Sequence, residues 1–146
     1  MRRLVREAER SAERFSCAPS YQGEGEGSAD MDKVDVGGAA KRLSDDTGAA
    51  AIIAMSDDGL LARRLARHRP AVPVLCATSS WKVGRQLQLL RAVHPLHVPV
   101  GSQGMEGMVE ETLSRATRAG LLLAGQTVVI VTGDADRAPT LTVRVV

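Results

Sequence analysis

The residues best suited to bind a ligand stand just after three predicted strands, in the stretches 56–59, 78–81 and 132–137. In open α/β sheets, ligands bind beyond the carboxyl ends of the strands. The N-termini of helices at the first two places could hold an anion, although Asp57 and Asp58 oppose one at the first. We favour the interpretation that both aspartates cap the helix that follows them.

The histidines and cysteines form no recognisable catalytic or metal-binding pattern. None of His68, His94 and His97 has a cysteine or an acid at metal-ligand spacing. Cys17 and Cys76 make no disulfide framework, and the apolar run around Cys76 predicts a small buried core residue. The sequence also lacks a nucleophile elbow, a P-loop and a dinucleotide fingerprint. We therefore predict no metal site and no bound cofactor in this chain.

Composition and charge restrict the class of partner. The formal net charge of +2 is too small to argue for nucleic acid by itself. The arginines in 63–69 could form a nucleic-acid patch, but we favour the solvated end of a helix. No apolar run approaches the roughly 18 residues that a membrane span needs, and the N-terminal arginines are interleaved with glutamates, unlike those of a transit peptide. The sequence thus predicts a cytoplasmic protein that binds neither nucleic acid nor a membrane.

The stretch 49–79 reads as strand, acidic turn, helix and strand. The apolar run 49–55 suits a strand that is buried on both faces, as parallel strands are. Residues 60–68 have helical spacing, with acids before the helix and arginines at its end, which suits the helix dipole. Pro70 stops the helix before a second apolar run at 72–77. This pattern predicts a right-handed βαβ unit.

The remaining elements complete an α/β fold. Helices are predicted at 31–46, after the capping candidates Ser79 and Ser80, and at 105–122, and strands at 93–100, 127–132 and 140–146. Pro95 and Pro99 place the third strand near a sheet edge. The connection before the last strand is too short for a helix, which predicts that this strand is antiparallel. We expect a three-layer sandwich, with helices on both faces of a five-stranded, mostly parallel sheet.

The first thirty residues are set apart from this fold. Residues 2–16 predict an amphipathic helix whose apolar stripe needs a partner surface. The stripe consists of Leu4, Ala8, Ala12 and Phe15. The next segment contains GEGEG, which could suggest a phosphate loop; because it lacks a preceding strand and a lysine, we favour a flexible linker. The predicted organisation is a helix at 1–17, a linker at 18–30 and an α/β domain at 31–146.

Several motifs, taken in order, resemble the C-terminal domain of pyruvate kinase. They are GLLARRLARHRPAVPVLCATSSWKVGRQLQLLRAVHP, GQTVVIVTG and TVRVV. The positions that fall on the family's pattern in the first motif are Gly59, Ala62, Ala66, Arg67, Arg69, Pro70, Thr78, Arg85, Gln86, Arg91 and Pro95. The resemblance covers residues 32–146 well. The opening MRRLVREAER is more weakly similar to the last helix of the family's catalytic barrel.

The resemblance implies a regulatory and oligomer-forming domain without its catalytic barrel. Magnesium and potassium are then expected only in that barrel, and the expected partner is a second copy of the chain or a pyruvate kinase catalytic barrel. Many members of the family bind a phosphorylated sugar as an effector, between a Thr-Lys-Ser-Gly turn and a glycine-rich loop. The positions that match this effector site are Ser56, Asp57, Asp58, Gly59, Asp134 and Arg137.

This sequence departs from the effector-site pattern at the residues that hold phosphate. Asp57 stands at the place of the turn lysine, Asp58 stands at that of the turn serine, and the loop 134–139 has no glycine. Because backbone nests for phosphate need glycine-like freedom, we expect a degenerate effector site. Two alternative functions remain open: a free-standing small-ligand-binding module with this fold, and a small enzyme of unknown reaction.

Overall fold

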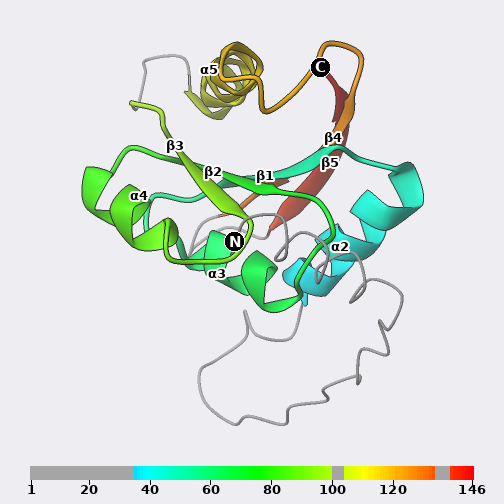
Figure 1. Cartoon of the computed structure of the whole chain (residues 1–146), viewed down its shortest axis with the longest axis horizontal. Helices are drawn as coiled ribbons and strands as arrows, with labels where there is room; N and C mark the ends of the chain where they lie inside the picture. Colours follow the sequence, from blue (N-terminus) through cyan, green and yellow to red (C-terminus); the bar gives the residue numbers. More distant parts are fainter. Residues whose placement is uncertain (1–34, 100–103, 134–138) are drawn as a thin grey trace, which may run out of the picture.

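A five-stranded sheet lies at the centre of the computed structural model, which describes residues 35–99, 104–133 and 139–146 (Figure 1). Across the sheet, the strands are β3 (Val93–His97), β2 (Val74–Thr78), β1 (Ala51–Met55), β4 (Thr127–Thr132) and β5 (Thr140–Val145). β1 pairs in parallel with β2 and β4, β2 pairs in parallel with β3, and β5 pairs antiparallel to β4. The structure confirms the antiparallel last strand and the edge position of the proline-containing strand.

Helices cover both faces of the sheet, as the sequence predicts. α2 (Val36–Thr47), α3 (Leu60–Arg67) and α4 (Trp81–Leu87) lie on one face, and α5 (Gly104–Arg118) lies on the other (Figure 1). The chain steps from β1 to β2 to β3 in one direction and then back across β1 to β4. Right-handed crossovers with opposite steps place their helices on opposite faces, which explains why α5 lies apart from α3 and α4.

Two hydrophobic cores share the same strands, because β1 and β2 are buried at every position. Alternate residues of β1 face opposite helix layers. Ile52 and Ala54 join the core beneath α2, α3 and α4, whereas Ala51, Ile53 and Met55 join the core beneath α5. A strand with apolar side chains on both faces reads as one continuous apolar run, and that run predicted β1 from the sequence.

The predicted end of the helix at 105–122 is wrong, although the helix itself is present as α5. The apolar Leu121 and Leu122 continue the helical pattern, but α5 ends at Arg118. Gly120 has a φ of 69°, and the Leu121 amide donates a hydrogen bond to the Ala116 carbonyl at 2.9 Å. This is the bond pattern of a helix that ends on a left-handed glycine. Leu122 therefore enters the core from a turn.

The predicted helix at 1–17 and linker at 18–30 lie outside the described residues, and so does the start of the predicted helix at 31–46. The described part of that helix is α2, which begins at Val36. It ends, as predicted, at Gly48, whose φ of 61° closes the helix in the left-handed conformation.

Helix α2 packs closely against α3. Oδ1 of Asp35 accepts a hydrogen bond from the Gly38 amide at 3.1 Å and also lies 2.8 Å from Nε2 of His68, which follows α3. Gly37 has no room for a side chain, because a Cβ there would overlap the His68 ring and lie 2.9 Å from the Arg64 carbonyl oxygen. Glycine is unfavourable inside a helix, but here it permits the close approach of two helices.

Gly37→Ala should destabilise the domain, although alanine favours a helix over glycine by about 1 kcal/mol. Forcing a methyl group into this packed contact costs about 1–3 kcal/mol, so we expect a net loss of about 1 kcal/mol in the free energy of unfolding, measured by urea denaturation. The matched control is Gly84→Ala in α4, where the nearest atom to the new methyl group is 3.8 Å away. The control should be neutral or stabilising, and equal effects of the two substitutions would contradict the tight α2–α3 contact.

Candidate functional site

The turn between β1 and α3, residues 56–59, lies at the carboxyl edge of the sheet, where the sequence predicts a ligand site. Gly59 has a φ of 73° at the N-cap of α3. A Cβ on this residue would lie 2.8 Å from Cγ1 of Val83 in α4. Both constraints favour glycine, which lets the turn pack directly against the neighbouring helix.

Asp58 caps the start of α3, as predicted. Its Oδ1 accepts hydrogen bonds from the Leu60 amide at 2.8 Å and from Oγ of Ser56 at 2.7 Å. The Leu60 amide and then the Ser56 hydroxyl lower the pKa of the Asp58 carboxyl below its ordinary value, because both bonds favour the charged form. The turn therefore holds a carboxylate that stays ionised near neutral pH.

Asp57 does not cap α3, so the prediction is wrong for this residue. Its Oδ1 accepts hydrogen bonds from the Ser79 amide at 2.8 Å and from Ser79 Oγ at 2.7 Å. Its carbonyl oxygen accepts a further bond from Oγ1 of Thr78 at 3.4 Å. These contacts tie the turn after β1 to the loop after β2. The cap of α4 is then supplied by Ser80, the second of the two predicted candidates.

The two aspartates occupy donors that an anion would need at this edge of the sheet. An anion at a helix N-terminus is held by backbone amides and nearby hydroxyl groups. Here the amide and hydroxyl of Ser79 donate to Asp57, and the hydroxyl of Ser56 donates to Asp58. At this edge, carboxylates of the protein itself therefore occupy the donors that an anionic ligand would use.

The loop that would complete the predicted effector site is mostly outside the described residues, and both Asp134 and Arg137 belong to that part. The two ends of the loop are close together. A Cβ on Gly133 would lie 2.9 Å from Cα of Pro139, and the strands that flank the loop are paired at Thr132 and Thr140. The loop thus begins and ends beside the carboxyl edge of β4.

An aromatic pair at the same edge was missed by the sequence analysis. Trp81, the first residue of α4, stacks on His97, the last residue of β3, with ring centroids 4.0 Å apart and planes 15° apart. Nη1 of Arg115 in α5 donates to the His97 carbonyl at 2.8 Å. The available signal was an unusual tryptophan directly after a helix cap, but its partner depends on how the strands pair.

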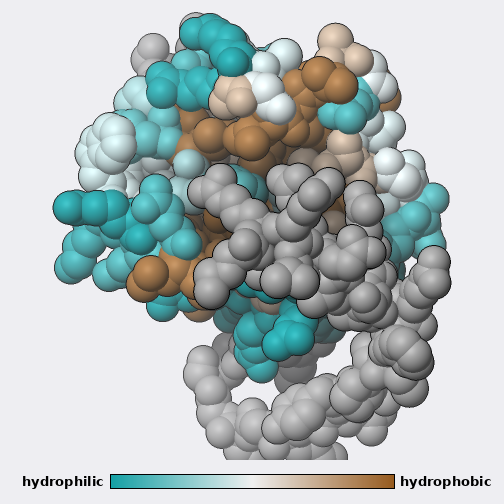
Figure 2. All heavy atoms as spheres, viewed as in Figure 1, coloured by the Kyte–Doolittle hydropathy of each residue, from teal (hydrophilic) through white to brown (hydrophobic). Residues whose placement is uncertain are grey.

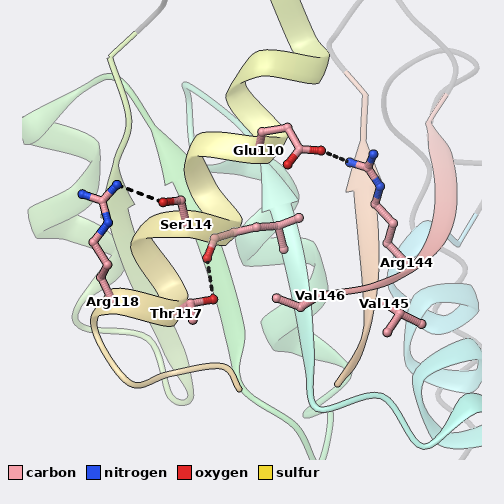
Figure 3. Close-up of a pocket in the computed structure, with 8 residues that line it drawn as sticks. Glu110, Ser114, Thr117, Arg118, Arg144, Val145 and Val146 are labelled. Carbon is pink, nitrogen blue, oxygen red and sulfur yellow. Dashed lines mark hydrogen bonds and ion pairs between the residues drawn. The ribbon is translucent and has the colours of Figure 1, made fainter. Parts of the chain in front are cut away.

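A hollow of about 440 Å³ lies between α5 and β5 (Figure 3). It is lined by Glu110, Leu113, Ser114, Thr117, Arg118, Arg144, Val145 and Val146. Its two arginines have partners within the chain. Arg144 lies 2.9 Å from Glu110 and 3.4 Å from Glu106, and Arg118 donates to Oγ of Ser114 at 3.0 Å. The hollow lies beside the C-terminal half of α5, apart from the predicted site at the other edge of the sheet.

The thiol of Cys76 is buried in β2, as predicted. Burial, helped by the charges of Asp58 and Asp57, raises the pKa of this thiol to about 12. The thiolate is the reactive form of cysteine, so Cys76 is a poor nucleophile near neutral pH.

Within the described residues, no group of three or more histidine, cysteine, aspartate or glutamate side chains is placed to hold a metal ion. In the same part of the chain, no helix has the length and apolar character needed to cross a membrane.

Comparison with known proteins decides the family. The family model for the pyruvate kinase alpha/beta domain matches residues 35–146. The chain belongs to the pyruvate kinase alpha/beta domain family. The matched range contains every helix and strand from α2 to β5, and the resemblance drawn from the sequence is confirmed.

Two curated pyruvate kinases match the same region. The protein from Eimeria tenella is 33% identical over 95 residues, which cover 65% of this chain and 18% of that protein. The protein from Clostridium acetobutylicum is 32% identical over 88 residues, which cover 60% of this chain and 18% of that protein. The chain thus spans about a fifth of the length of these relatives.

A solved structure shares the fold. A pyruvate kinase from Cryptosporidium parvum superimposes on 74% of this chain, over 22% of its own length, with a TM-score of 0.65 and 21% sequence identity. The similarity agrees with the three-layer α/β architecture of the pyruvate kinase domain described above.

Stability should fall in acid partly because of Asp58. Its pKa is lower in the folded state, so its bonds contribute stability above the ordinary carboxyl pKa of 3.8, and this contribution is lost as the pH falls through the lowered value. Because the side chain is largely exposed to solvent, we expect Asp58→Asn to cost only about 0.5 kcal/mol at neutral pH. The variant should also flatten the acid loss of stability, measured by urea denaturation at a series of pH values.

Ser56→Ala is the matched variant for this test, because it removes one of the two donors to Asp58 and leaves the carboxylate. It should change the pH dependence in the same direction and by less. An Asp58→Asn protein with an unaltered acid profile would contradict the assigned bonds.

Proposed function

We propose that this chain acts as a pyruvate kinase C-terminal domain that assembles with further copies or with a catalytic barrel, and that does not bind a sugar-phosphate effector. The proposal depends on the two hydrogen bonds from Ser79 to the Asp57 carboxylate, at 2.8 and 2.7 Å. The resemblance implies that many family members hold an effector at this edge, whereas here the side chains of the turn bond to the neighbouring loop. We therefore expect the domain to keep its fold and to lose the binding of a phosphorylated sugar.

The same residues support a role without catalysis. Phosphoryl transfer depends on metal ions positioned by carboxylates and on cations that stabilise the developing charge. The carboxylates of Asp57 and Asp58 are held by hydrogen bonds from the chain, and that of Glu110 is held by Arg144. The resemblance assigns substrate, magnesium and potassium binding to a barrel domain. We therefore expect no phosphate transfer by this chain itself, and a cytoplasmic location beside other glycolytic enzymes.

Electrostatics argue against a sugar phosphate at the β1–α3 turn. The N-terminus of α3 offers roughly half a unit of positive charge. A carboxylate about 4 Å from a phosphate opposes it by about 4 kcal/mol per pair of unit charges at an effective dielectric constant of 20, before screening by salt. Asp57 and Asp58 both stand at this turn, so the balance is unfavourable even if screening removes most of the repulsion.

Exposed apolar side chains support assembly. β5 is an edge strand, and its Val143 and Val145 are 42% and 66% exposed. Leu123, in the turn before β4, is 66% exposed, and Figure 2 shows hydrophobic atoms at the surface beside α5 and the sheet. An edge strand presents unpaired backbone groups to another chain, and exposed apolar surface marks interaction sites.

A free-standing small-ligand module is the alternative function, and the hollow between α5 and β5 favours it. An acidic ligand there would have to displace Glu110 from Arg144 or Ser114 from Arg118. The two functions differ in solution: the module would bind its ligand as a monomer, whereas the proposed domain assembles.

Titration calorimetry with fructose bisphosphate at low ionic strength tests the effector part. The chain should show no submillimolar binding, because its donors are occupied and its turn is acidic. Asp57→Lys combined with Asp58→Ser should recover part of the affinity, since it frees the Ser79 donors and replaces negative charge with positive. Submillimolar binding by the unaltered chain that is lost in Ser56→Ala would contradict the proposal.

The control for the double variant is Asp45→Lys combined with Asp46→Ser, at the exposed end of α2. It makes the same change in net charge away from the carboxyl-edge turn. A gain in affinity as large as that of the turn variant would show that net charge alone attracts the sugar phosphate.

Light scattering over a range of concentrations tests assembly. The chain should form dimers or larger species, alone or when mixed with a pyruvate kinase catalytic barrel. Val145→Lys should weaken this association, because it places a charge on the exposed edge strand. Leu89→Lys is the control, since Leu89 is 87% exposed but follows α4 instead. A chain that stays monomeric in both experiments would contradict this part of the proposal.

A further inference from the structure

A long central stretch of the sequence contains no acidic residue. Between Asp58 and Glu106 there are seven lysines and arginines and no aspartate or glutamate. The seven are Arg63, Arg64, Arg67, Arg69, Lys82, Arg85 and Arg91. The small net charge of the chain hides this asymmetry, because the acids lie before and after the stretch.

The fold brings these cations onto one surface. α3 and α4 lie on the same face of the sheet, and Nη2 of Arg63 in α3 donates to Oε1 of Gln86 in α4 at 3.2 Å. Arg63, Arg67, Lys82 and Arg85 are all exposed. Figure 2 shows hydrophilic residues over the outer side of α4. We call the exposed side of these two helices the basic surface.

Trp81 adds an aromatic platform to the basic surface. It is 68% exposed, and one face of its indole stacks on the His97 ring at 4.0 Å. Most of the surface of the residue stays exposed despite this stack. The bond from Arg115 to the His97 carbonyl, 2.8 Å long, fixes the strand end that supports the ring. Arg85 lies one helical turn after Trp81, on the same side of α4.

We propose that the basic surface binds single-stranded nucleic acid, with a base stacked on Trp81 and the phosphates held by Lys82, Arg85, Arg63 and Arg67. Proteins that bind single strands combine a positively charged track with aromatic side chains on which bases stack. Lys82 and Arg85 lie in the same helix as the indole, and Arg63 and Arg67 extend the charge along a second helix. This spread suits a run of phosphates better than a single nucleotide.

Three carboxylates lie next to α3 and the start of α4, and all have partners within the chain. Asp35 lies 2.8 Å from His68 at the end of α3, and Asp58 has an attractive Coulombic interaction with Arg64. Asp57 is turned toward Ser79, and Asp58 is turned toward the start of α3 and Ser56. Both are held at the edge of the sheet by hydrogen bonds. This inference goes beyond the proposed function and does not rest on it, because the effector site and the assembly surface are argued from other residues. It replaces the expectation from the sequence that the arginines at 63–69 form only a solvated helix end.

The intrinsic fluorescence of the chain reports on the platform directly, since Trp81 is its single tryptophan. Titration with single-stranded oligonucleotides of about eight nucleotides, a common site size, should quench this fluorescence. Affinity should fall as salt rises, with a slope of about 0.7 per phosphate contact. Adenosine monophosphate, heparin and anionic phospholipid vesicles are the comparison ligands, and each should bind more weakly at equal salt.

Variants separate stacking from charge when binding is followed by the anisotropy of a labelled oligonucleotide. Trp81→Ala should weaken binding about tenfold and leave the salt slope unchanged, as expected for one lost base stack. Trp81→Phe should restore part of the affinity. Lys82→Gln combined with Arg85→Gln should weaken binding and reduce the salt slope. Arg118→Gln, on α5 at the opposite face of the sheet, removes one positive charge and should have no effect.

Several outcomes would overturn the inference. Absence of quenching at low salt would do so, as would equal binding of the oligonucleotide by the Trp81→Ala protein. Binding of heparin or of vesicles as tight as that of the oligonucleotide would show a general polyanion or lipid surface. Equally tight binding of adenosine monophosphate would reduce the site to a single-nucleotide pocket.

Discussion

The structure depends on the burial of one strand, β1, from all sides. Its backbone pairs with β2 on one edge and with β4 on the other, and its side chains from Ala51 to Met55 are buried. An unpaired buried backbone group costs about 1–3 kcal/mol, so the central strand needs both neighbours. Two parallel neighbours require two crossovers of opposite direction, and these place helices on both faces of the sheet.

The pairing of the strands also decides which residues meet at the carboxyl edge. Met55 is paired with Ala77, and two residues after each of them stand Asp57 and Ser79, which form the bond that closes this edge. In the same way, β2 and β3 end together at Thr78 and His97. Because α4 begins three residues after Thr78, its first residue, Trp81, stacks on His97. The contacts at the site follow from the alignment of the strands.

The dependence of the site on strand pairing explains which features could be predicted from the sequence and which could not. A strand buried on both faces leaves a continuous apolar run, and a connection too short for a helix implies an antiparallel strand, so the sheet was predictable. The partner of Asp57 was not, because a carboxylate before a helix is most simply read as a cap and Ser79 becomes its neighbour only through strand pairing. The end of α5 was mispredicted for a similar reason: Leu121 and Leu122 are apolar, but Gly120 turns the chain first.

The small net charge of the chain conceals an uneven distribution of charge, because acidic and basic side chains gather on different parts of the surface. The acidic β1–α3 turn lies at the carboxyl edge of the sheet, whereas the exposed cations of α3 and α4 lie on the helices of one face. The two regions meet where Arg64 of α3 has an attractive Coulombic interaction with Asp58. The acids of the β1–α3 turn are fixed by bonds from the chain itself, whereas Arg63, Arg67, Lys82 and Arg85 are exposed. A fold shared with pyruvate kinases therefore specifies where the edges and faces lie, and the side chains placed on each of them specify what it binds.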